Sequence, residues 1–163
     1  MLKEKKYARE SVTTYTQMIM PNDTNPLNGL MGGIMMQWMD IVGAIAAQKH
    51  SNCIVVTASV DHISFANTIQ IGDVITLKAH VTRAFNTSME VYIEAFAENI
   101  PEAKKVTSNH AFFTFVALDA NRKPVKVPEL IPETEEEVKL YQGAVNRRKV
   151  RLTLAKKENL EDF

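Results

Sequence analysis

The segment from Ile34 to Ala47, IMMQWMDIVGAIAA, predicts a helix that is apolar on nearly every face. Such a helix needs cover around its whole circumference, from a sheet or from a sheet and a second chain. Asp40 lies within this run and is the only acidic residue between Asp23 and Asp61. Because burying an unpartnered carboxylate costs several kcal/mol, the sequence predicts a small polar pocket around Asp40.

The chain of 163 residues has the length of one domain with a sizeable core. Its 19 Lys and Arg residues balance its 19 Asp and Glu residues, so no overall field would draw it to nucleic acid or to an anionic membrane. Cys53 is the single cysteine, and no segment has the pattern of a signal peptide or a bilayer span. We therefore expect a cytoplasmic protein without a nucleic-acid or membrane partner.

Strand-like segments precede and follow this helix. β-branched runs and alternating apolar residues predict five strands, at residues 10–20, 54–65, 74–84, 88–98 and 105–118. The helix is predicted at residues 34–50, and a turn at 85–87 joins two of the strands. Thr134 and Glu137 form a capping box that begins a second, C-terminal helix.

This order of elements predicts an α+β fold, in which a five-stranded antiparallel sheet is wrapped around one long apolar helix. We expect the sheet domain over residues 1–131 and a helical extension of the same domain over residues 132–163. A single helix covers one face of the sheet and leaves strand edges and a flank of the helix open. A second copy of the chain would cover them, so a dimer is expected.

Several separated motifs resemble those of one known family. They are DTN at 23–25, GG at 32–33, MD at 39–40, VVTASVD at 55–61, TSMEV at 87–91, FFTFVALD at 112–119, and VPEL with PETEEE at 127–137. From about residue 18 to residue 141 the chain resembles the cytoplasmic acyl-CoA thioester hydrolases of hot-dog fold. The resemblance implies a hot-dog dimer, often assembled into a hexamer (a trimer of dimers) or a tetramer. It also implies hydrolysis of acyl-CoA to a free acid and coenzyme A, which makes coenzyme A part of the substrate and requires no cofactor.

Two residues match functional positions of that family. Asn25 matches its active-site asparagine, and Asp40 matches its catalytic aspartate. Between them the sequence departs from the pattern, because many relatives have DTNHHG where this chain has DTNPLNG. The departure bears on the shape of the loop and on acyl preference, and it leaves both catalytic positions intact.

Thioester hydrolysis needs a base for the attacking water and donors for the oxyanion. We expect Asp40 to be the base, Asn25 to position the water or the carbonyl, and the amides at Gly32 and Gly33 to bind the oxyanion. Gly33 and Asp40 stand about 10 Å apart along a helix axis. Both must approach one carbon atom, so we expect two antiparallel helices, with Asp40 of one subunit facing the loop 25–33 of the other.

Other side chains are candidates for substrate contacts. Thr57 or Ser59 would place a hydroxyl beside Asp40, and the sequence leaves open which one does. The resemblance places Ser88 near the coenzyme A moiety, and Arg83 is a candidate for its phosphates. Either a solvated helix face or further phosphate contacts would explain four basic residues: Arg147, Arg148, Lys149 and Arg151.

Two other functions stay open at this stage. An acyl-CoA sensor would bind a thioester without cleaving it, although it would not need the base that Asp40 offers. An enoyl-CoA hydratase of this fold would need a histidine close after Asp40, and His50 is too far along the chain. Asp61 is the second candidate for a catalytic carboxylate. The histidines lack the spacing of metal ligands, so no metal site is predicted.

Overall fold

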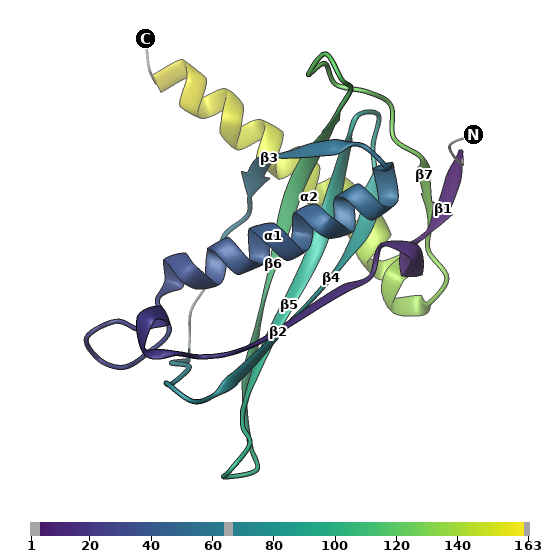
Figure 1. Ribbon diagram of the computed structural model, residues 1–163. Coiled ribbons are helices and arrows are strands. Elements are labelled where there is room, and N and C mark those ends of the chain that lie inside the picture. Colours follow the sequence, from purple (N-terminus) through teal and green to yellow (C-terminus); the bar gives the residue numbers. More distant parts are fainter. Residues whose placement is uncertain (1–3, 64–66, 162–163) are drawn as a thin grey trace.

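The computed structural model describes residues 4–63 and 67–161. Helix α1 (Gly32–Ser51) lies across a five-stranded sheet, and the long helix α2 (Glu135–Glu161) lies behind it (Figure 1). The other elements are β1 (Lys5–Tyr7), the 3-10 helix η1 (Ala8–Ser11), β2 (Thr13–Met18), the 3-10 helix η2 (Pro21–Asp23), β3 (Ile54–Val60), β4 (Val74–Ala84), β5 (Ser88–Asn99), β6 (Lys104–Leu118) and β7 (Glu129–Ile131).

The five-stranded sheet is antiparallel, with the strand order β2-β4-β5-β6-β3. Strands β2 and β3 are therefore its edges, and β3 pairs with β6 alone within the described sheet. We call the face against α1 the inner face and the face against α2 the outer face. The predicted α+β fold is confirmed, as is the turn at 85–87, where the Phe85 N–H donates to the Ser88 carbonyl at 2.8 Å.

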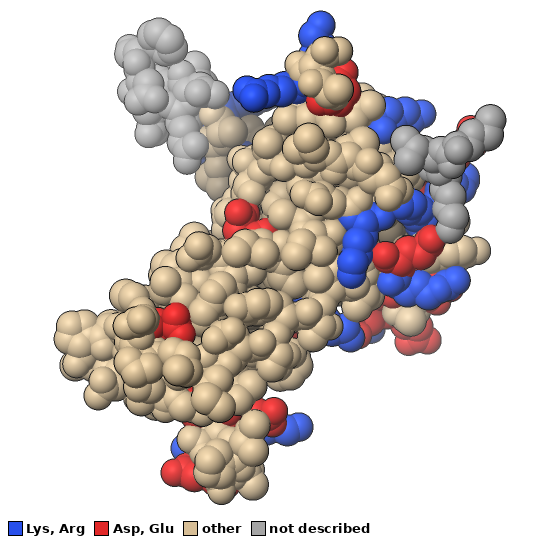
Figure 2. Space-filling model, viewed as in Figure 1, with Lys and Arg blue, Asp and Glu red and all other residues tan. Residues whose placement is uncertain are grey.

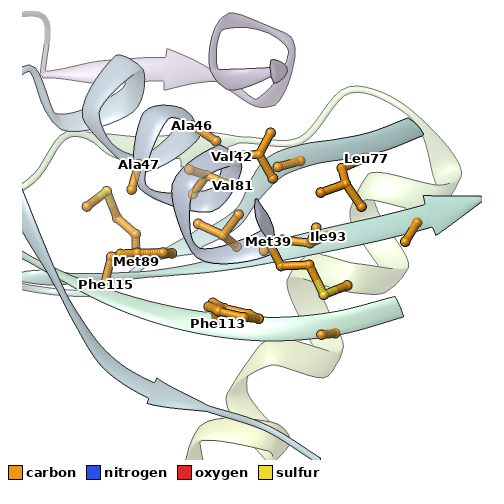
Figure 3. Close-up of a cluster of buried hydrophobic side chains, with 14 of the residues drawn as sticks. Met39, Val42, Ala46, Ala47, Leu77, Val81, Met89, Ile93, Phe113 and Phe115 are labelled. Atoms are coloured by element: carbon orange, nitrogen blue, oxygen red, sulfur yellow. The ribbon is translucent and has the colours of Figure 1, made fainter. Parts of the chain in front are cut away.

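The hydrophobic core lies between α1 and the inner face of the sheet (Figure 3). Alternate residues of β4, β5 and β6 are buried there, as their period-two patterns predict. The labelled contacts come from Met39, Val42, Ala46 and Ala47 of α1 and from Leu77, Val81, Met89, Ile93, Phe113 and Phe115 of the sheet. Burying one such large side chain contributes about 1.5–3 kcal/mol.

The N-terminal strand is shorter than predicted, because residues 8–11 form the 3-10 helix η1. The Ser11 hydroxyl donates to the Ala8 carbonyl at 2.7 Å and accepts from the Val81 N–H at 2.9 Å. A side chain therefore takes the place of backbone pairing with β4 at this point. The strand predicted at residues 54–65 ends at Val60, and Phe65 lies outside the described residues.

A two-stranded parallel pair of β1 with β7 was not predicted. Each strand has only three residues, which is too short for an alternation to stand out in the sequence. The pair ties the N-terminal segment to the segment that leads into α2. In this way it fixes where α2 starts.

Helix α2 begins with the predicted capping box. The Glu137 N–H donates to Thr134 Oγ1 at 3.1 Å, and the Thr134 N–H donates to Glu137 Oε2 at 3.2 Å. The helix then crosses the outer face, and its C-terminal turns extend beyond the sheet (Figure 1). No helix in the described part of the chain combines the length and the hydropathy of a membrane span.

One broad surface of the chain is apolar and uncovered. Figure 2 shows few charged side chains across the middle of this view, where α1 lies in front, and more of them toward the ends of the molecule. Exposed apolar side chains on this side are Met36, Ile41 and Ile45 of α1 and Val60 of β3, which pairs with the inner-face residue Phe113. Ile54 and Val56 of the same edge strand are also exposed, but they pair with Leu118 and Val116 and point to the outer face. Their exposure matches the open helix flank and strand edge that the sequence predicts.

Candidate active site

Asp40 lies in the middle of α1 and is partly buried. Its Oδ1 accepts a hydrogen bond of 2.5 Å from the Thr57 hydroxyl on β3. Within the residues that the structure describes, Oδ2 makes no hydrogen bond and is left to accept from a water molecule. The carboxylate in the apolar helix therefore has one fixed partner and one unoccupied oxygen.

A β-bulge decides which hydroxyl meets Asp40. Thr57 pairs with Phe115, which is buried on the inner face, whereas Ser59 pairs with Thr114, so the register shifts by one residue between them. Thr57 consequently points toward α1, and Ser59 lies on the outer face. The question that the sequence leaves open is answered in favour of Thr57.

Asn25 shapes the loop that precedes α1. Its Oδ1 accepts from the Leu27 N–H at 2.9 Å and from the Gly29 N–H at 3.2 Å, which closes a tight turn. The side-chain nitrogen Nδ2 makes no hydrogen bond to any described residue, so it is available as a donor. The predicted role of Asn25 in positioning a carbonyl or a water would use this nitrogen.

The N-terminus of α1 is open to a ligand. The helix begins at Gly32 after Met31, and no side chain caps it. Gly33 is exposed, and a Cβ atom built on it would meet nothing within 4 Å. First-turn amides at a positive dipole end, beside free space, are the arrangement that an oxyanion requires.

One chain does not bring all these groups to one point. Gly33 and Asp40 lie on the same helix about 10 Å apart along its axis, and no hydrogen bond joins Asn25 to Asp40 among the described residues. The structure thus assembles two half-sites, one around Asp40 and Thr57, the other around Asn25 and the start of α1. A site that used both groups would need a second chain to supply one of them.

A pocket of about 240 Å³ lies on the outer face between the sheet and α2. Two predicted contact residues, Ser59 and Ser88, line it together with Arg148 and Arg151 of α2. Arg83 is not part of its lining. It donates to the Tyr141 carbonyl at 3.0 Å and stacks on the Tyr141 ring, so it holds α2 against the sheet.

A buried ion network under α2 was missed by the sequence analysis. Glu90 is fully buried and accepts from the Thr82 hydroxyl at 2.7 Å, from Arg147 Nη2 at 2.7 Å and from Arg151 Nη2 at 2.8 Å. Burial alone would raise the pKa of the Glu90 carboxyl, but these hydrogen bonds outweigh it and leave the pKa below its ordinary value. Arg147 and Arg151 are therefore not part of a solvated face.

Asp61, the second candidate carboxylate, also belongs to this network. Its Oδ2 accepts from Arg151 Nη1 at 2.8 Å. This places Asp61 on the outer face, away from Asp40. Among the described residues, no three histidine, cysteine, aspartate or glutamate side chains gather as metal ligands would.

Comparison with known sequences identifies the class of protein. The thioesterase superfamily model matches residues 27–104. An uncharacterized acyl-CoA thioester hydrolase of Bacillus subtilis is 39% identical over 144 residues, covering 88% of this chain and 84% of that protein. The chain belongs to the thioesterase superfamily. Within it, the chain is a member of the acyl-CoA thioester hydrolases, a family of enzymes, and the expected family is confirmed.

Solved structures agree with this assignment. A hexameric acyl-CoA thioesterase superposes with a TM-score of 0.90 and 36% identity, covering 93% of this chain and 97% of that chain. Acyl-CoA hydrolase from Staphylococcus aureus, solved with butyryl coenzyme A, coenzyme A and coenzyme A disulfide, gives a TM-score of 0.86 and 35% identity, covering 96% and 97%. Three further structures of that enzyme replace an aspartate, an asparagine and a threonine with alanine. The hot-dog fold expected from the sequence is confirmed.

Proposed function

We propose that this protein hydrolyses acyl-CoA thioesters to a free carboxylic acid and coenzyme A. The observation that carries the proposal is the Asp40 carboxylate, which Thr57 holds at 2.5 Å within an otherwise apolar helix. An aspartate fixed on one oxygen and unoccupied on the other is suited to take a proton from water. Relatives and structural neighbours that are named acyl-CoA thioester hydrolases support the same chemistry.

In the proposed reaction the water oxygen attacks the thioester carbon as Asp40 takes one of the water protons. The carbonyl oxygen becomes an oxyanion, which the amides at Gly32 and Gly33 and the Nδ2 donor of Asn25 stabilise. The intermediate then collapses, the carbon–sulfur bond breaks, and the thiolate of coenzyme A accepts the proton from Asp40. The products are the free acid and coenzyme A, and no cofactor takes part.

The sequence spacing of the site residues supports these roles. In the Staphylococcus aureus variants, the replaced asparagine, aspartate and threonine are separated by the same numbers of residues as Asn25, Asp40 and Thr57 are here. Those three positions are also the ones that this chain arranges around its two half-sites. Asp61 has no counterpart in that set.

We propose that the active unit is a dimer with two equivalent sites. Two copies would meet through the apolar surface of α1 and β3, with their α1 helices antiparallel, so that Asp40 of one chain faces Asn25 and Gly33 of the other. The surface includes an edge strand, which a second strand would complete. A hexameric structural neighbour supports further assembly, and a trimer of dimers or a tetramer is compatible with such dimers.

The coenzyme A moiety would bind at the outer-face pocket. Ser59 and Ser88 offer hydroxyls there, and the exposed Arg148 offers a charge for its phosphates. Arg151 and Arg83 are already engaged with protein groups, which leaves Arg148 as the better phosphate partner. Raised salt should therefore weaken substrate binding.

The test is release of free thiol from acyl-CoA substrates of several chain lengths. Thiol release with saturated substrates is the result expected of a hydrolase. Binding without release would contradict the proposal and favour a sensor. Hydration of enoyl-CoA without thiol release would contradict it in favour of a hydratase.

A further inference from the structure

Among the described residues, one side-chain hydrogen bond ties β3, or the residue directly after it, to a helix on each face of the sheet. On the inner face Thr57 donates to Asp40 at 2.5 Å, and on the outer face Asp61, the residue after the strand, accepts from Arg151 at 2.8 Å. We propose that Asp61 and Arg151 are positioning residues that hold β3 so that Thr57 stays in contact with Asp40. The proposal rests on the thioesterase function proposed above.

Strand β3 needs such an anchor because its own pairing is weak near Thr57. It has one neighbour in the described sheet, and the bulge at Thr57 and Ser59 interrupts the ladder beside the Thr57 side chain. After Val60, the Asp61 N–H still donates to the Phe112 carbonyl at 2.9 Å. The side chain of Asp61 adds a second, charged attachment at the same point.

Arg151 is a fixed point against which Asp61 is held. Its other guanidinium nitrogen, Nη2, donates to the fully buried Glu90 carboxylate at 2.8 Å. Glu90 is in turn held by Thr82 and Arg147. The Arg151 and Asp61 side chains are only 14% and 23% exposed, so water competes little for this charge-assisted hydrogen bond.

A rigid connection therefore runs from α2 through Arg151 and Asp61 into β3, and from Thr57 to Asp40 on the other face. If β3 moves when this connection is cut, Thr57 moves relative to Asp40, and a small displacement of a catalytic group is costly in rate. We therefore expect loss of the Asp61 side chain to lower kcat rather than to raise KM. Arg151 also lines the outer-face pocket, so replacing it would alter substrate binding as well, and Asp61 is the cleaner position to test.

The experiment is a double-mutant cycle on purified full-length protein, with kcat and KM measured by thiol release from one acyl-CoA. We expect Asp61→Ala to lower kcat about tenfold with little change in KM. Asp61→Asn, which keeps a neutral acceptor for Arg151, should lower kcat less. If Asp61 acts through Thr57, the double variant Asp61→Ala/Thr57→Ala should be no slower than Thr57→Ala alone.

The matched control is Asp119→Ala, which removes the carboxylate of the residue that follows β6. Asp119 accepts from the Asn121 and Lys123 N–H groups and not from Arg151, so the control leaves the anchor of β3 in place. The control variant should have nearly the kcat of the wild type. Combined with Thr57→Ala, it should lower kcat by the product of the two single effects, as expected for independent sites. An unchanged kcat in Asp61→Ala would overturn the positioning role. So would a double variant whose loss of kcat equals the product of the two single losses. In both cases normal thiol release by the wild type would leave the proposed function standing. Wild-type protein without any thiol release would instead overturn the proposed function.

Discussion

The Thr57 hydroxyl donates a hydrogen bond of 2.5 Å to Oδ1 of Asp40, and it is the contact that joins β3 to the carboxylate of α1. Removing it in Thr57→Ala should lower kcat/KM about 10- to 100-fold, because hydrogen bonds to charged groups contribute about 1.5–3 kcal/mol. Thr57→Ser keeps the hydroxyl and should retain most of the activity. Equal losses in both variants, measured by thiol release, would show that the hydroxyl is not what matters.

A site built from two chains predicts complementation between inactive variants. Asp40→Asn and Asn25→Ala should each have little activity alone. When the two are unfolded and refolded together, mixed dimers contain one site with both wild-type residues, so about a quarter of wild-type turnover should return. No recovery, with mixed dimers demonstrated by mass spectrometry, would contradict the shared site.

Gly43 sets how closely α1 approaches the sheet. A Cβ atom at this position would lie 2.9 Å from Ile93 Cδ1 and 3.0 Å from Phe115 Cε2. Gly43→Ala should therefore overpack the core and lower the free energy of unfolding by about 1–3 kcal/mol, as measured in urea. Gly33→Ala is the control, since its Cβ would meet nothing within 4 Å and its unfolding free energy should not fall.

His50 makes the stability of the fold sensitive to acid. It is fully buried, and its Nε2–H donates to the Pro128 carbonyl at 2.8 Å. Burial lowers the pKa of His50 below its ordinary 6.5, although the Pro128 hydrogen bond acts in the opposite direction and the nearby charge of Lys6 lowers the pKa further. Near pH 6.5 the unfolded chain therefore takes up a proton at His50 that the folded chain does not.

It follows that the contribution of His50 to the free energy of unfolding is largest above pH 6.5 and decreases as the pH falls below it. His50→Gln has no group to titrate there, so its unfolding free energy should change less between pH 6.5 and pH 5. The measurement is denaturant unfolding at several pH values. If the unfolding free energies of the wild type and of His50→Gln depended on pH in the same way, His50 would not be buried in its neutral form.

Much of the fold could be predicted because it follows from short-range patterns. The alternation in β4 and β5 placed Ile75, Leu77, Met89 and Ile93 on the buried face, where the structure has them. The capping box at Thr134 marked the start of α2. The long apolar helix predicted both a covering sheet and an uncovered flank. Each of these features depends on neighbours within a few residues of one another.

The features that were missed depend on contacts between distant segments. Glu90 alternates like a solvent-facing residue, and only the docking of α2 buries it beside Arg147 and Arg151. The bulge that separates Thr57 from Ser59 leaves no signature in the local sequence. The family resemblance supplied Asn25 and Asp40 as candidate site residues, and their catalytic roles stay predictions. The hydrogen bonds that support β3 on both faces of the sheet could not be predicted, because they join segments far apart in the sequence.

The most direct measurement of the central claim is the rate of thiol release from acyl-CoA by Asp40→Asn. The amide keeps an acceptor for Thr57 but is not a base. We predict that kcat falls at least about 100-fold, while the oligomeric state and the melting temperature stay close to those of the wild type. Turnover near the wild-type rate would contradict Asp40 as the base on which the proposed reaction depends.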